Sequence, residues 1–510
     1  MAGRIGALSV AAVLLALTLG TLAMVAARAG ANFALGPGDL AAVRFTVVQA
    51  ALSALVSVAL AVPVARALAR RRFAGRGALI ALLGAPFLLP VIVAVLGLLA
   101  VFGRAGIVNT ALGWAGLPPM SIYGLHGVVL AHVFFNMPLA VRLILQGWQA
   151  IPAERFRLAA ALGFAPRDVF RHLERPMLRA VLPGAAVVVF LICLTSFAVA
   201  LTLGGGPRAT TVEVAIYQAL RFAFDPDRAA TLALVQFGLC ALAVGLAGRF
   251  ALPSGFGSGL DRVAAPFAPG GWHRAVDVLV IVLATGFVAM PLVMVGLRGA
   301  PGLADLPAGV WPAASRSLAV ALVSSLLSTG AALVLALAVA QGARRFELVA
   351  MLPLTASSLV LGTGLFLAVH PFLRPDSLAL PVTVLVNATL ALPFAYRILA
   401  PEAQAAQTSF GQLALALGLH GGARLRWLTL PRLRRPLGFA LGITAALSMG
   451  DLGVIVLFAG DGAATLPLLV QQLMGAYRMQ DAAAAALLLV AASFALFALF
   501  DYGGRRGAAA

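Results

Sequence analysis

Twelve long, uninterrupted apolar segments follow one another along this chain of 510 residues. They lie at about 5–27, 46–68, 78–102, 123–148, 182–203, 229–249, 275–297, 315–341, 347–370, 378–399, 434–458 and 482–500. A helix crosses the hydrocarbon core of a bilayer with about 20 residues, and each segment is close to that length. Continuous runs disfavour a transmembrane β-barrel, whose strands alternate apolar and polar residues. The sequence therefore predicts an all-α polytopic membrane protein with about 12 transmembrane helices.

The composition agrees with a membrane protein. Hydrophobic residues make up 62% of the chain and charged residues 10%, whereas a soluble domain has about 45–50% and about 25%. Disorder is excluded, because it needs low hydrophobicity. The first apolar segment follows Arg4, as in a signal peptide, but it is longer than the apolar region of one. It is therefore predicted to remain as a membrane span.

All 36 basic residues are arginine, and the absence of lysine excludes two kinds of site. A P-loop needs a lysine on the phosphates, and a Schiff-base enzyme needs a lysine amine. Cys193 and Cys240 lie in apolar runs, and the six histidines lack metal-binding spacing. No carboxylates are paired at catalytic spacing. The sequence thus predicts no cofactor, no metal and no enzyme activity, so any ATP hydrolysis that this chain depends on must come from another protein.

The arginines also predict how the chain lies in the membrane. Of the 36, 26 fall at the termini or in loops on one side of the segments, and ten fall in the opposite loops. By the positive-inside rule, both termini are then cytoplasmic. The net charge of +19 is explained by this topology and by contacts with anionic membrane lipid. No arginine-rich face outside the membrane loops favours a nucleic-acid partner.

The chain contains an internal repeat. Three landmark pairs keep one spacing of 255 residues: Pro138 with Pro393, Gly163 with Gly418, and Pro176 with Pro431. Similar segments at 52–57 and 323–328 are 271 residues apart, which implies a longer loop in the first half, at about 103–121. Six spans per half make the halves parallel, around a central path. We expect repeats at 1–250 and 275–510, joined by a cytoplasmic Gly-, Pro- and Ser-rich linker at 251–274.

A long cytoplasmic loop follows the fourth span of each half. In the first half, Pro152 and Glu154 favour a helix start, and Gly163 favours its end. A second short helix is expected from about Pro166, with Pro176 preceding the next span. The loop from Ser409 to Gly438 is expected to repeat this layout. Each loop thus presents a short amphipathic helix, which either packs on its own spans or contacts another protein.

The loop residues resemble the EAA…G…P motif in the permeases of binding-protein-dependent ABC importers. The matching positions are Glu154, Ala159, Ala160, Gly163 and Pro176 in the first half, and Ser409, Ala414, Gly418 and Pro431 in the second. The resemblance implies a type I, MetI-like permease fold whose two short helices dock on an ATPase subunit homodimer and transmit its closure. The second half departs from the motif, because Ser409 replaces the glutamate and Leu415 replaces the second alanine.

A further resemblance suggests the substrate. The stretches at Leu194–Gln236 and Met449–Phe458 resemble the fused permeases for thiamine and thiamine pyrophosphate in Gram-negative bacteria. This implies an inner-membrane importer that receives thiamine or its phosphates from a periplasmic substrate-binding protein. Two alternatives remain: a fused ferric-iron permease with the same loop motifs, and a secondary transporter with twelve spans.

Asp451 is the acidic residue deepest in a predicted span. Ionisable groups inside the membrane are candidate functional sites. Because thiamine carries a positively charged thiazolium ring, a carboxylate on its route is plausible, and Asp451 is the candidate substrate-path residue. The alternative is a structural aspartate paired with a backbone group or an arginine. Gly450 and Gly453 flank it and predict a local helix break.

Three acidic residues lie in the long outward loop predicted after the fifth span: Glu213, Asp225 and Asp227. Arginines lie beside them at Arg208, Arg221 and Arg228. Charges of this kind steer association between proteins, so the three acids are candidate contacts for the binding protein. A solvated loop with no partner is the alternative.

Overall fold

The computed structural model describes residues 2–29, 34–247, 270–460 and 462–506. All regular structure in these residues is helical, which confirms the all-α prediction. The helices up to residue 247 are α1 (Ala2–Leu15), α2 (Thr21–Ala29), α3 (Pro37–Arg70), α4 (Arg76–Leu82), α5 (Ala85–Leu88), α6 (Val91–Phe102), α7 (Ile107–Trp114), α8 (Leu125–Ala150), α9 (Ala153–Ala161), α10 (Pro166–Val169), α11 (Arg175–Leu194), α12 (Ala198–Leu203), α13 (Val212–Arg221) and α14 (Pro226–Ala247).

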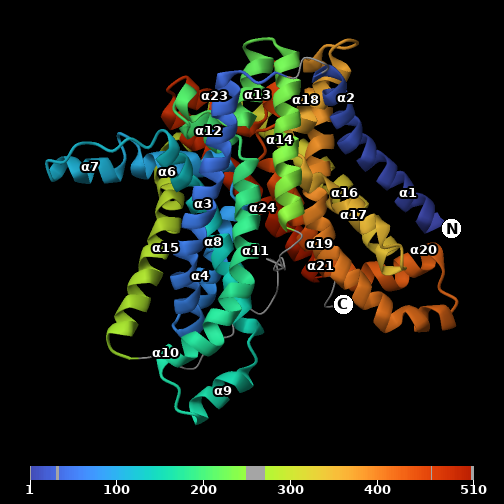
Figure 1. Ribbon diagram of the computed structural model, residues 1–510. Coiled ribbons are helices and arrows are strands. Elements are labelled where there is room, and N and C mark those ends of the chain that lie inside the picture. The colour runs from blue at the N-terminus through green and yellow to red at the C-terminus, as the bar shows by residue number, and fades with distance from the viewer. Residues whose placement is uncertain (1, 30–33, 248–269, 461, 507–510) are drawn as a thin grey trace.

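Ten further helices follow residue 270, and the long ones lie beside the first set in one bundle (Figure 1). They are α15 (Trp272–Gly299), α16 (Val310–Ala340), α17 (Arg345–Met351), α18 (Ser358–Val369), α19 (Ala379–Ala416), α20 (Gly421–Arg424), α21 (Leu430–Met449), α22 (Ile455–Phe458), α23 (Leu466–Gly475) and α24 (Met479–Arg506). The predicted linker at 251–274 falls mostly outside the described residues, and α15 begins three residues before the predicted start of the second repeat.

The predicted count of twelve spans is not confirmed. In the described residues, ten helical stretches are long and apolar enough to cross a membrane. An eleventh arises if Arg345–Thr355 and Ser358–Val369, which meet at 90°, form one broken span. The remaining predicted segment corresponds to α21, whose first turns carry Arg432, Arg434 and Arg435. Positive charges are costly in the hydrocarbon core, so this helix does not stand out as a span.

Four predicted spans are wrong as continuous helices. The span at 78–102 is divided into α4, α5 and α6, and the span at 347–370 is the bent pair described above. The other two are at 182–203 and 434–458. The first breaks after Leu194 and resumes as α12, and the second breaks after Met449 and resumes as α22. Gly450 ends α21, as the glycines around Asp451 predicted, and it packs directly on Pro90. The breaks fall at corresponding places, because Leu194 and Met449 are 255 residues apart.

Matching elements recur through the described residues at the spacings found in the sequence. The helices α11 and α21 begin and end 255 residues apart, as do the π-helical turns before them, at Phe170–Glu174 and Leu425–Thr429. Hydrogen bonds recur as well. Thr46 Oγ1 accepts the Val212 N–H at 2.9 Å, and Ser317 Oγ accepts the Leu466 N–H at 2.8 Å. The acceptor residues of these two bonds are 271 residues apart.

The first long helix of each set packs on the other set. The helix α2 contacts α14 and α18, and α15 contacts α24 and α6. Glycine permits both crossings, because a Cβ on Gly364 would lie 2.6 Å from the Thr21 carbonyl oxygen and a Cβ on Gly97 would lie 2.6 Å from that of Pro291. Small residues are the usual means of close helix packing in membranes. The two sets are therefore interlocked rather than merely side by side.

Residues 103–121, expected to form a longer loop, build a hairpin that extends sideways from the bundle and contains α7 (Figure 1). Asn109 holds it together. Its Nδ2 donates to the carbonyl oxygens of Gly103 and Met120, both at 2.9 Å, and its Oδ1 accepts the Met120 N–H at 2.7 Å. Trp114, the last residue of α7, is 86% exposed.

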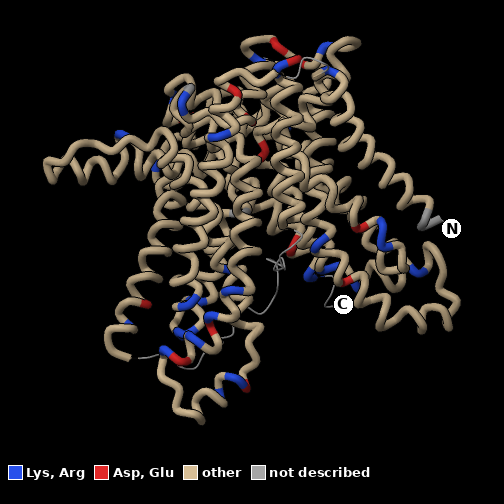
Figure 2. Tube along the Cα trace, in the orientation of Figure 1, with Lys and Arg blue, Asp and Glu red and all other residues tan. Residues whose placement is uncertain are grey.

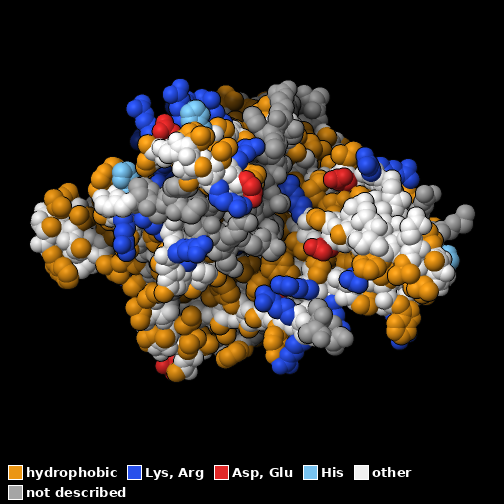
Figure 3. All heavy atoms as spheres, turned by 90° about the horizontal axis from the view of Figure 1, so that it is seen from below, with side chains coloured by type: hydrophobic (Ala, Val, Ile, Leu, Met, Phe, Trp, Pro, Cys, Tyr) orange, Lys and Arg blue, Asp and Glu red, His pale blue; other side chains and the backbone are white. Residues whose placement is uncertain are grey.

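Most arginines gather at one end of the bundle, which we call the arginine-rich end (Figure 2). Seen from that end, their side chains surround patches of hydrophobic residues (Figure 3). A buried ion pair lies here between the two sets of helices. Asp277 on α15 accepts from Arg70 Nη2 at 2.9 Å and from Arg71 Nε at 2.7 Å, both on or next to the end of α3. This ion pair thus joins α3 and α15, which belong to different sets of helices.

Candidate functional site

The motif residues of the first loop form a tight helix-ending turn. Gly163 has φ +67°, its N–H donates to the Ala160 carbonyl oxygen at 2.9 Å, and the Phe164 N–H donates to that of Ala159 at 2.9 Å. These two bonds define a Schellman motif, which ends helices at a left-handed residue. The structure thus brings together Ala159, Ala160 and Gly163, and the predicted end of the helix is confirmed.

The second loop has the same turn. Gly418 has φ +66°, its N–H donates to the Leu415 carbonyl oxygen at 3.0 Å, and the Leu419 N–H donates to that of Ala414 at 2.9 Å. Leu415 departs from the sequence motif, but it takes part in the turn through its backbone carbonyl group. The replacement of alanine by leucine at this position therefore leaves the geometry unchanged.

The helices that lead into the two turns differ, which corrects the prediction of one layout. In the first half, α9 is a separate helix that begins after Pro152. In the second half, the corresponding residues are the last turns of the 38-residue helix α19. Proline disfavours helical geometry in the residue before it, and Ile151 is extended, with ψ 121°. The corresponding position in the second half, 407, is glutamine, so the helix continues.

Each loop exposes leucines at matching positions. Leu158 is 61% exposed and Leu413 54%, and one helical turn further Leu162 is 61% exposed and Leu417 65%. Phe156, Ala159 and Ala414 are buried on the inner side. Glu154 is exposed and pairs with Arg157 at 2.7 Å, and Ser409 is also exposed. Matched exposed apolar groups are typical of a surface that binds another protein.

Pro176 and Pro431 lie away from these turns. The helix expected from about Pro166 runs through a π-helical turn directly into α11, so Pro176 is inside the long helix rather than before it. Within that turn the Arg175 N–H donates to the carbonyl oxygen of Phe170, five residues back, and Leu430 does the same with Leu425. Widening of this kind accommodates a proline ring inside a helix.

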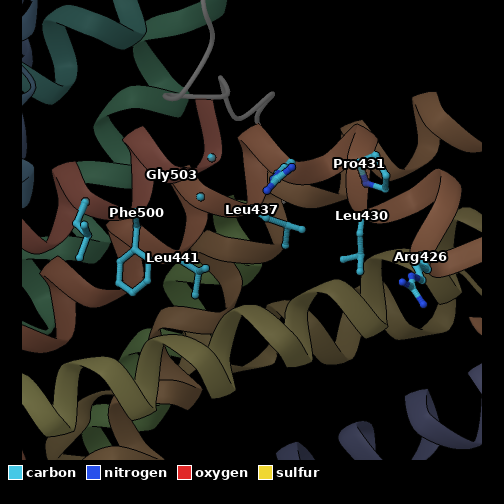
Figure 4. A pocket seen from close by; sticks show the side chains of 11 residues that line it. Arg426, Leu430, Pro431, Leu437, Leu441, Phe500 and Gly503 are labelled. Atoms are coloured by element: carbon cyan, nitrogen blue, oxygen red, sulfur yellow. The ribbon is translucent and has the colours of Figure 1, made fainter. Parts of the chain in front are cut away.

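Pro431 also lines an apolar groove of about 490 Å³ between α21 and α24. In Figure 4 the labelled side chains run in a row from Arg426 to Leu441, with Phe500 beside Leu441. The groove shares no lining residue with the cavity described next. It is therefore a separate hollow, lined by residues 426–441 and 499–504 of the second set of helices.

A cavity of about 370 Å³ lies between the two sets of helices. Its polar lining residues include Thr195, Ser196, Ser358 and Asp451, together with His132 and Asn136 on α8. Its walls come from both sides of the interface at corresponding positions: Leu139 with Phe394, Ser196 with Asp451, and Phe197 with Leu452, each pair 255 residues apart. The cavity therefore lies where the two repeats face each other.

Asp451 contributes the carboxylate of this cavity. The backbone groups of Gly453 and Val454 hydrogen-bond to the carboxyl group, but Oδ2 is buried and has no hydrogen-bond partner. No arginine pairs with Asp451 in the described part of the chain. The glycine at 453 is required, because a side chain there would overlap Ser358 Oγ. The predicted helix break thus directs an unpaired carboxylate oxygen to the interface of the two repeats.

The sequence prediction missed His132, which also lines the cavity. The residue is 3% exposed, its Nδ1 lies 3.1 Å from Ser53 Oγ, and its Nε2 has no hydrogen-bond partner. Neighbouring Asn136 donates from Nδ2 to the His132 carbonyl oxygen at 2.9 Å. A single histidine in an apolar segment gives no signal in the sequence, because only the packing of α8 brings it to the cavity.

Glu213 corrects the prediction of a surface contact. It lies at the start of α13 and is completely buried, so its side chain cannot meet another protein. Gln236 and Ser357 lie close to the carboxyl group, yet both of its oxygens lack a hydrogen-bond partner. Burial raises the pKa of Glu213 to about 8.

The stability of the protein should consequently fall as the pH rises. The folded state holds the Glu213 proton with a pKa of about 8, and the unfolded chain with an ordinary value of 4.5. This stabilisation is complete below pH 4.5 and is lost as the pH rises to about 8. Thermal unfolding at about pH 6 and about pH 8.5 measures the effect, and Glu213→Gln should remove most of the difference. An unchanged pH dependence in Glu213→Gln would contradict this assignment.

The other two acids of that loop remain near the surface. Asp227 is exposed and pairs with Arg28 at 2.6 Å. Asp225 accepts the Arg228 N–H at 2.9 Å, and the Arg228 side chain pairs with Asp39 at 2.8 Å. These contacts fix α2, α3 and α14 to one another at the end of the bundle opposite the arginine-rich end.

Comparison with known proteins gives closely similar relatives. The thiamine transport system permease protein ThiP of Brucella abortus (strain 2308) is 42% identical over 475 residues, which cover 90% of this chain and 86% of that protein. ThiP of Escherichia coli (strain K12) is 39% identical over 485 residues, covering 90% and 88%. The molybdenum transport system permease protein ModB of Mycobacterium bovis is 31% identical over 208 residues, 41% of this chain. No protein-family model matches the chain.

Proposed function

The chain belongs to the ThiP family of thiamine transport permeases, and from this membership we propose that it carries thiamine across the bacterial inner membrane as the permease of an ABC importer. The observation that carries the proposal is the identity of 39–42% over about nine tenths of the chain. Thiamine phosphates, each with the same thiazolium ring, are included in the proposed substrate class.

The proposed orientation places the arginine-rich end in the cytoplasm. This follows the positive-inside rule, which favours arginine on the cytoplasmic side. Both termini are then cytoplasmic, and the chain spans the inner membrane several times. The proposed organisation is two permease repeats, at 1–250 and 275–510, joined by a cytoplasmic linker at 251–274.

The two cytoplasmic loops are proposed to couple the permease to an ATPase homodimer. The exposed leucines at matching positions, held by matching turns, give each ATPase subunit an equivalent surface to bind. Closure of the ATPase dimer around ATP draws these loops together. The interlocked repeats then rock, and the cavity between them opens to the opposite side of the membrane. The permease itself is proposed to have no ATPase activity, because a P-loop needs lysine and the chain has none.

At the opposite end, a periplasmic binding protein is proposed to deliver the substrate. Asp227 and Asp225 remain candidates for that contact, because Asp227 is exposed in the first turn of α14 and Asp225 directly precedes that helix. Charges at such a rim mainly change the association rate. Asp227→Ala is expected to slow the binding protein's association at low salt with little effect at high salt, measured by surface plasmon resonance. If the binding protein associates with Asp227→Ala and with the original permease at equal rates at low salt, Asp227 is not part of the contact.

Uptake by cells tests the proposal and separates it from the ferric-iron alternative. Cells without a thiamine importer of their own receive this permease with its neighbouring ATPase and binding-protein genes, and are then offered labelled thiamine or labelled iron. We expect saturable thiamine uptake that requires all three proteins and no gain in iron uptake. Iron uptake without thiamine uptake would overturn the proposed substrate, and thiamine uptake without the ATPase would favour a secondary transporter.

A further inference from the structure

The cavity between the repeats has the size and lining of a small-molecule site. Its volume of about 370 Å³ falls in the usual range for ligand pockets, about 300–1,000 Å³. Such pockets are mostly apolar, with a few polar groups that fix the orientation of the ligand. Here the apolar surface includes the rings of Phe135, Phe197 and Phe394. The polar groups come from both repeats.

Two buried polar atoms of the lining are left without a partner. They are Asp451 Oδ2 from the second repeat and His132 Nε2 from the first. Buried polar atoms are nearly always hydrogen-bonded in folded proteins, because an unsatisfied one costs free energy. Their positions on one cavity, from opposite sides of an interface, indicate a ligand that binds both.

The chemistry of the lining defines that ligand. Asp451 is the charged residue of the lining, and no arginine among the lining residues neutralises it. The cavity is therefore negative and favours a cation. Aromatic faces attract cations and stack on flat rings, so Phe135, Phe197 and Phe394 favour a cation that is itself a ring. His132 Nε2 offers one hydrogen bond, as donor or acceptor according to its tautomer.

We propose that this cavity is a substrate-selective site within the permease, in which Asp451 binds the positively charged ring of the substrate and His132 hydrogen-bonds to a polar ring attached to it. The inference rests on the proposed function, because thiamine joins a thiazolium cation to an aminopyrimidine ring. It adds that the permease, and not only its binding protein, recognises the substrate.

The position of the site also supplies a means of release. Its two polar groups belong to different repeats, and Gly450 of one repeat packs directly on Pro90 of the other. When the repeats rock apart, Asp451 and His132 separate, and the substrate loses one of its two polar contacts. A hydrogen bond to a charged group such as Asp451 is worth about tenfold in affinity or more. The site therefore binds the substrate selectively when the repeats are together and weakly when they have moved apart.

Transport by the reconstituted complex tests the site. Permease, ATPase and binding protein are assembled in liposomes, and the probes are labelled thiamine and its neutral isostere, in which a carbon replaces the thiazolium nitrogen. We expect Asp451→Asn to lower thiamine uptake about tenfold or more, the effect of one charged contact. The preference for thiamine over the isostere should fall by a similar factor. ATP hydrolysis stimulated by loaded binding protein should continue, because the coupling loops are unchanged.

His132 is tested by a graded pair of variants. His132→Gln keeps a polar group that can hydrogen-bond in the cavity and should retain most uptake, whereas His132→Leu should lower it about tenfold. His370→Leu is the matched control, because His370 is exposed and does not line the cavity. It should change uptake by less than about twofold.

The outcomes separate the site from the proposed function. If the original permease carries no thiamine, the proposed function fails. If it carries thiamine and Asp451→Asn retains both uptake and preference, the function stands and the site is wrong. A variant that loses ATP hydrolysis as well as uptake has lost its fold or its coupling. Asp451→Glu then decides, because it should restore hydrolysis and part of the uptake if the carboxylate is the essential group.

Discussion

A permease with valine in place of both Gly163 and Gly418 should lose nearly all thiamine uptake and yet remain folded in the membrane. Both residues have left-handed φ, +67° and +66°, where a β-branched side chain is strongly disfavoured. The cost is about 1–2 kcal/mol at each turn, so the equilibrium constant for forming both turns falls about thirtyfold or more. The exposed leucines before each turn then lose their fixed position. ATP hydrolysis stimulated by loaded binding protein should fall together with uptake.

Two matched variants, each with two substitutions, isolate the turn as the cause. Gly163→Asn with Gly418→Asn should retain most activity, because asparagine adopts the left-handed conformation at low cost. Valine at Gly238 and Gly330, which lie in helices with open space around them, should also leave uptake nearly intact. Co-purification with the ATPase measures the contact directly. Full coupling in the double valine variant would show that these turns do not carry the signal.

Removing the carboxylate of Asp277 should produce the largest loss of stability. Asp277 is 5% exposed and pairs with Arg70 at 2.9 Å and with Arg71 at 2.7 Å. Breaking a buried ion pair by removing one partner costs about 3–5 kcal/mol, because the remaining charge stays buried. Here it also removes a link between α3 and α15, which belong to different repeats. Asp277→Ala should therefore unfold at a markedly lower temperature.

The two buried cysteines provide the measurement. Cys193 and Cys240 are both completely buried, so a thiol-reactive fluorescent dye reports unfolding in detergent. Asp376→Ala is the matched control. The side chains of Asp376 and its partner Arg374 are 51% and 88% exposed, and an exposed pair is worth only about 0–1 kcal/mol. Equal unfolding temperatures for Asp277→Ala and the control would show that the buried pair does not hold the repeats together.

Much of the coupling loop could be predicted from local sequence. Proline and glycine impose strong backbone preferences on their own positions, so the start of α9 after Pro152 and the turn at Gly163 follow from the residues themselves. The same reasoning failed for the second loop, where glutamine at 407 lets α19 continue to Ala416. The break at Gly450 was predicted because two glycines flank Asp451. The corresponding break after Leu194 was not, since Thr195, Ser196 and Phe197 carry no such signal.

What depends on packing between distant segments could not be predicted. The charged residues around Glu213 predict that it is a surface acid. In the structure, α13 directs its side chain inward, toward Gln236 and Ser357. His132 reads as an ordinary residue of an apolar helix, and its place on the cavity follows from the way α8 faces the second repeat. Hydrophobic periodicity describes single helices, and these positions are fixed by pairs of helices far apart in the sequence.

Because the first long helix of each repeat packs on the other repeat, the two interfaces form at different times during synthesis. Thr21 on α2 meets Gly364 on α18, which follows it by 343 residues, whereas Pro291 on α15 meets Gly97, which the ribosome has already made. At about 5–20 residues per second, roughly 20–70 seconds separate Thr21 from its partner.

The first helix must therefore wait in the lipid, or beside the insertion machinery, while later helices enter the membrane around it. The first helix of the second repeat finds its partner at once. Two interfaces that look equivalent in the finished permease are thus formed at different times, and a ribosome that stops after α14 leaves α1 without α16 and α2 without α18. Joining both repeats in one chain keeps the waiting helix beside the partner that will arrive.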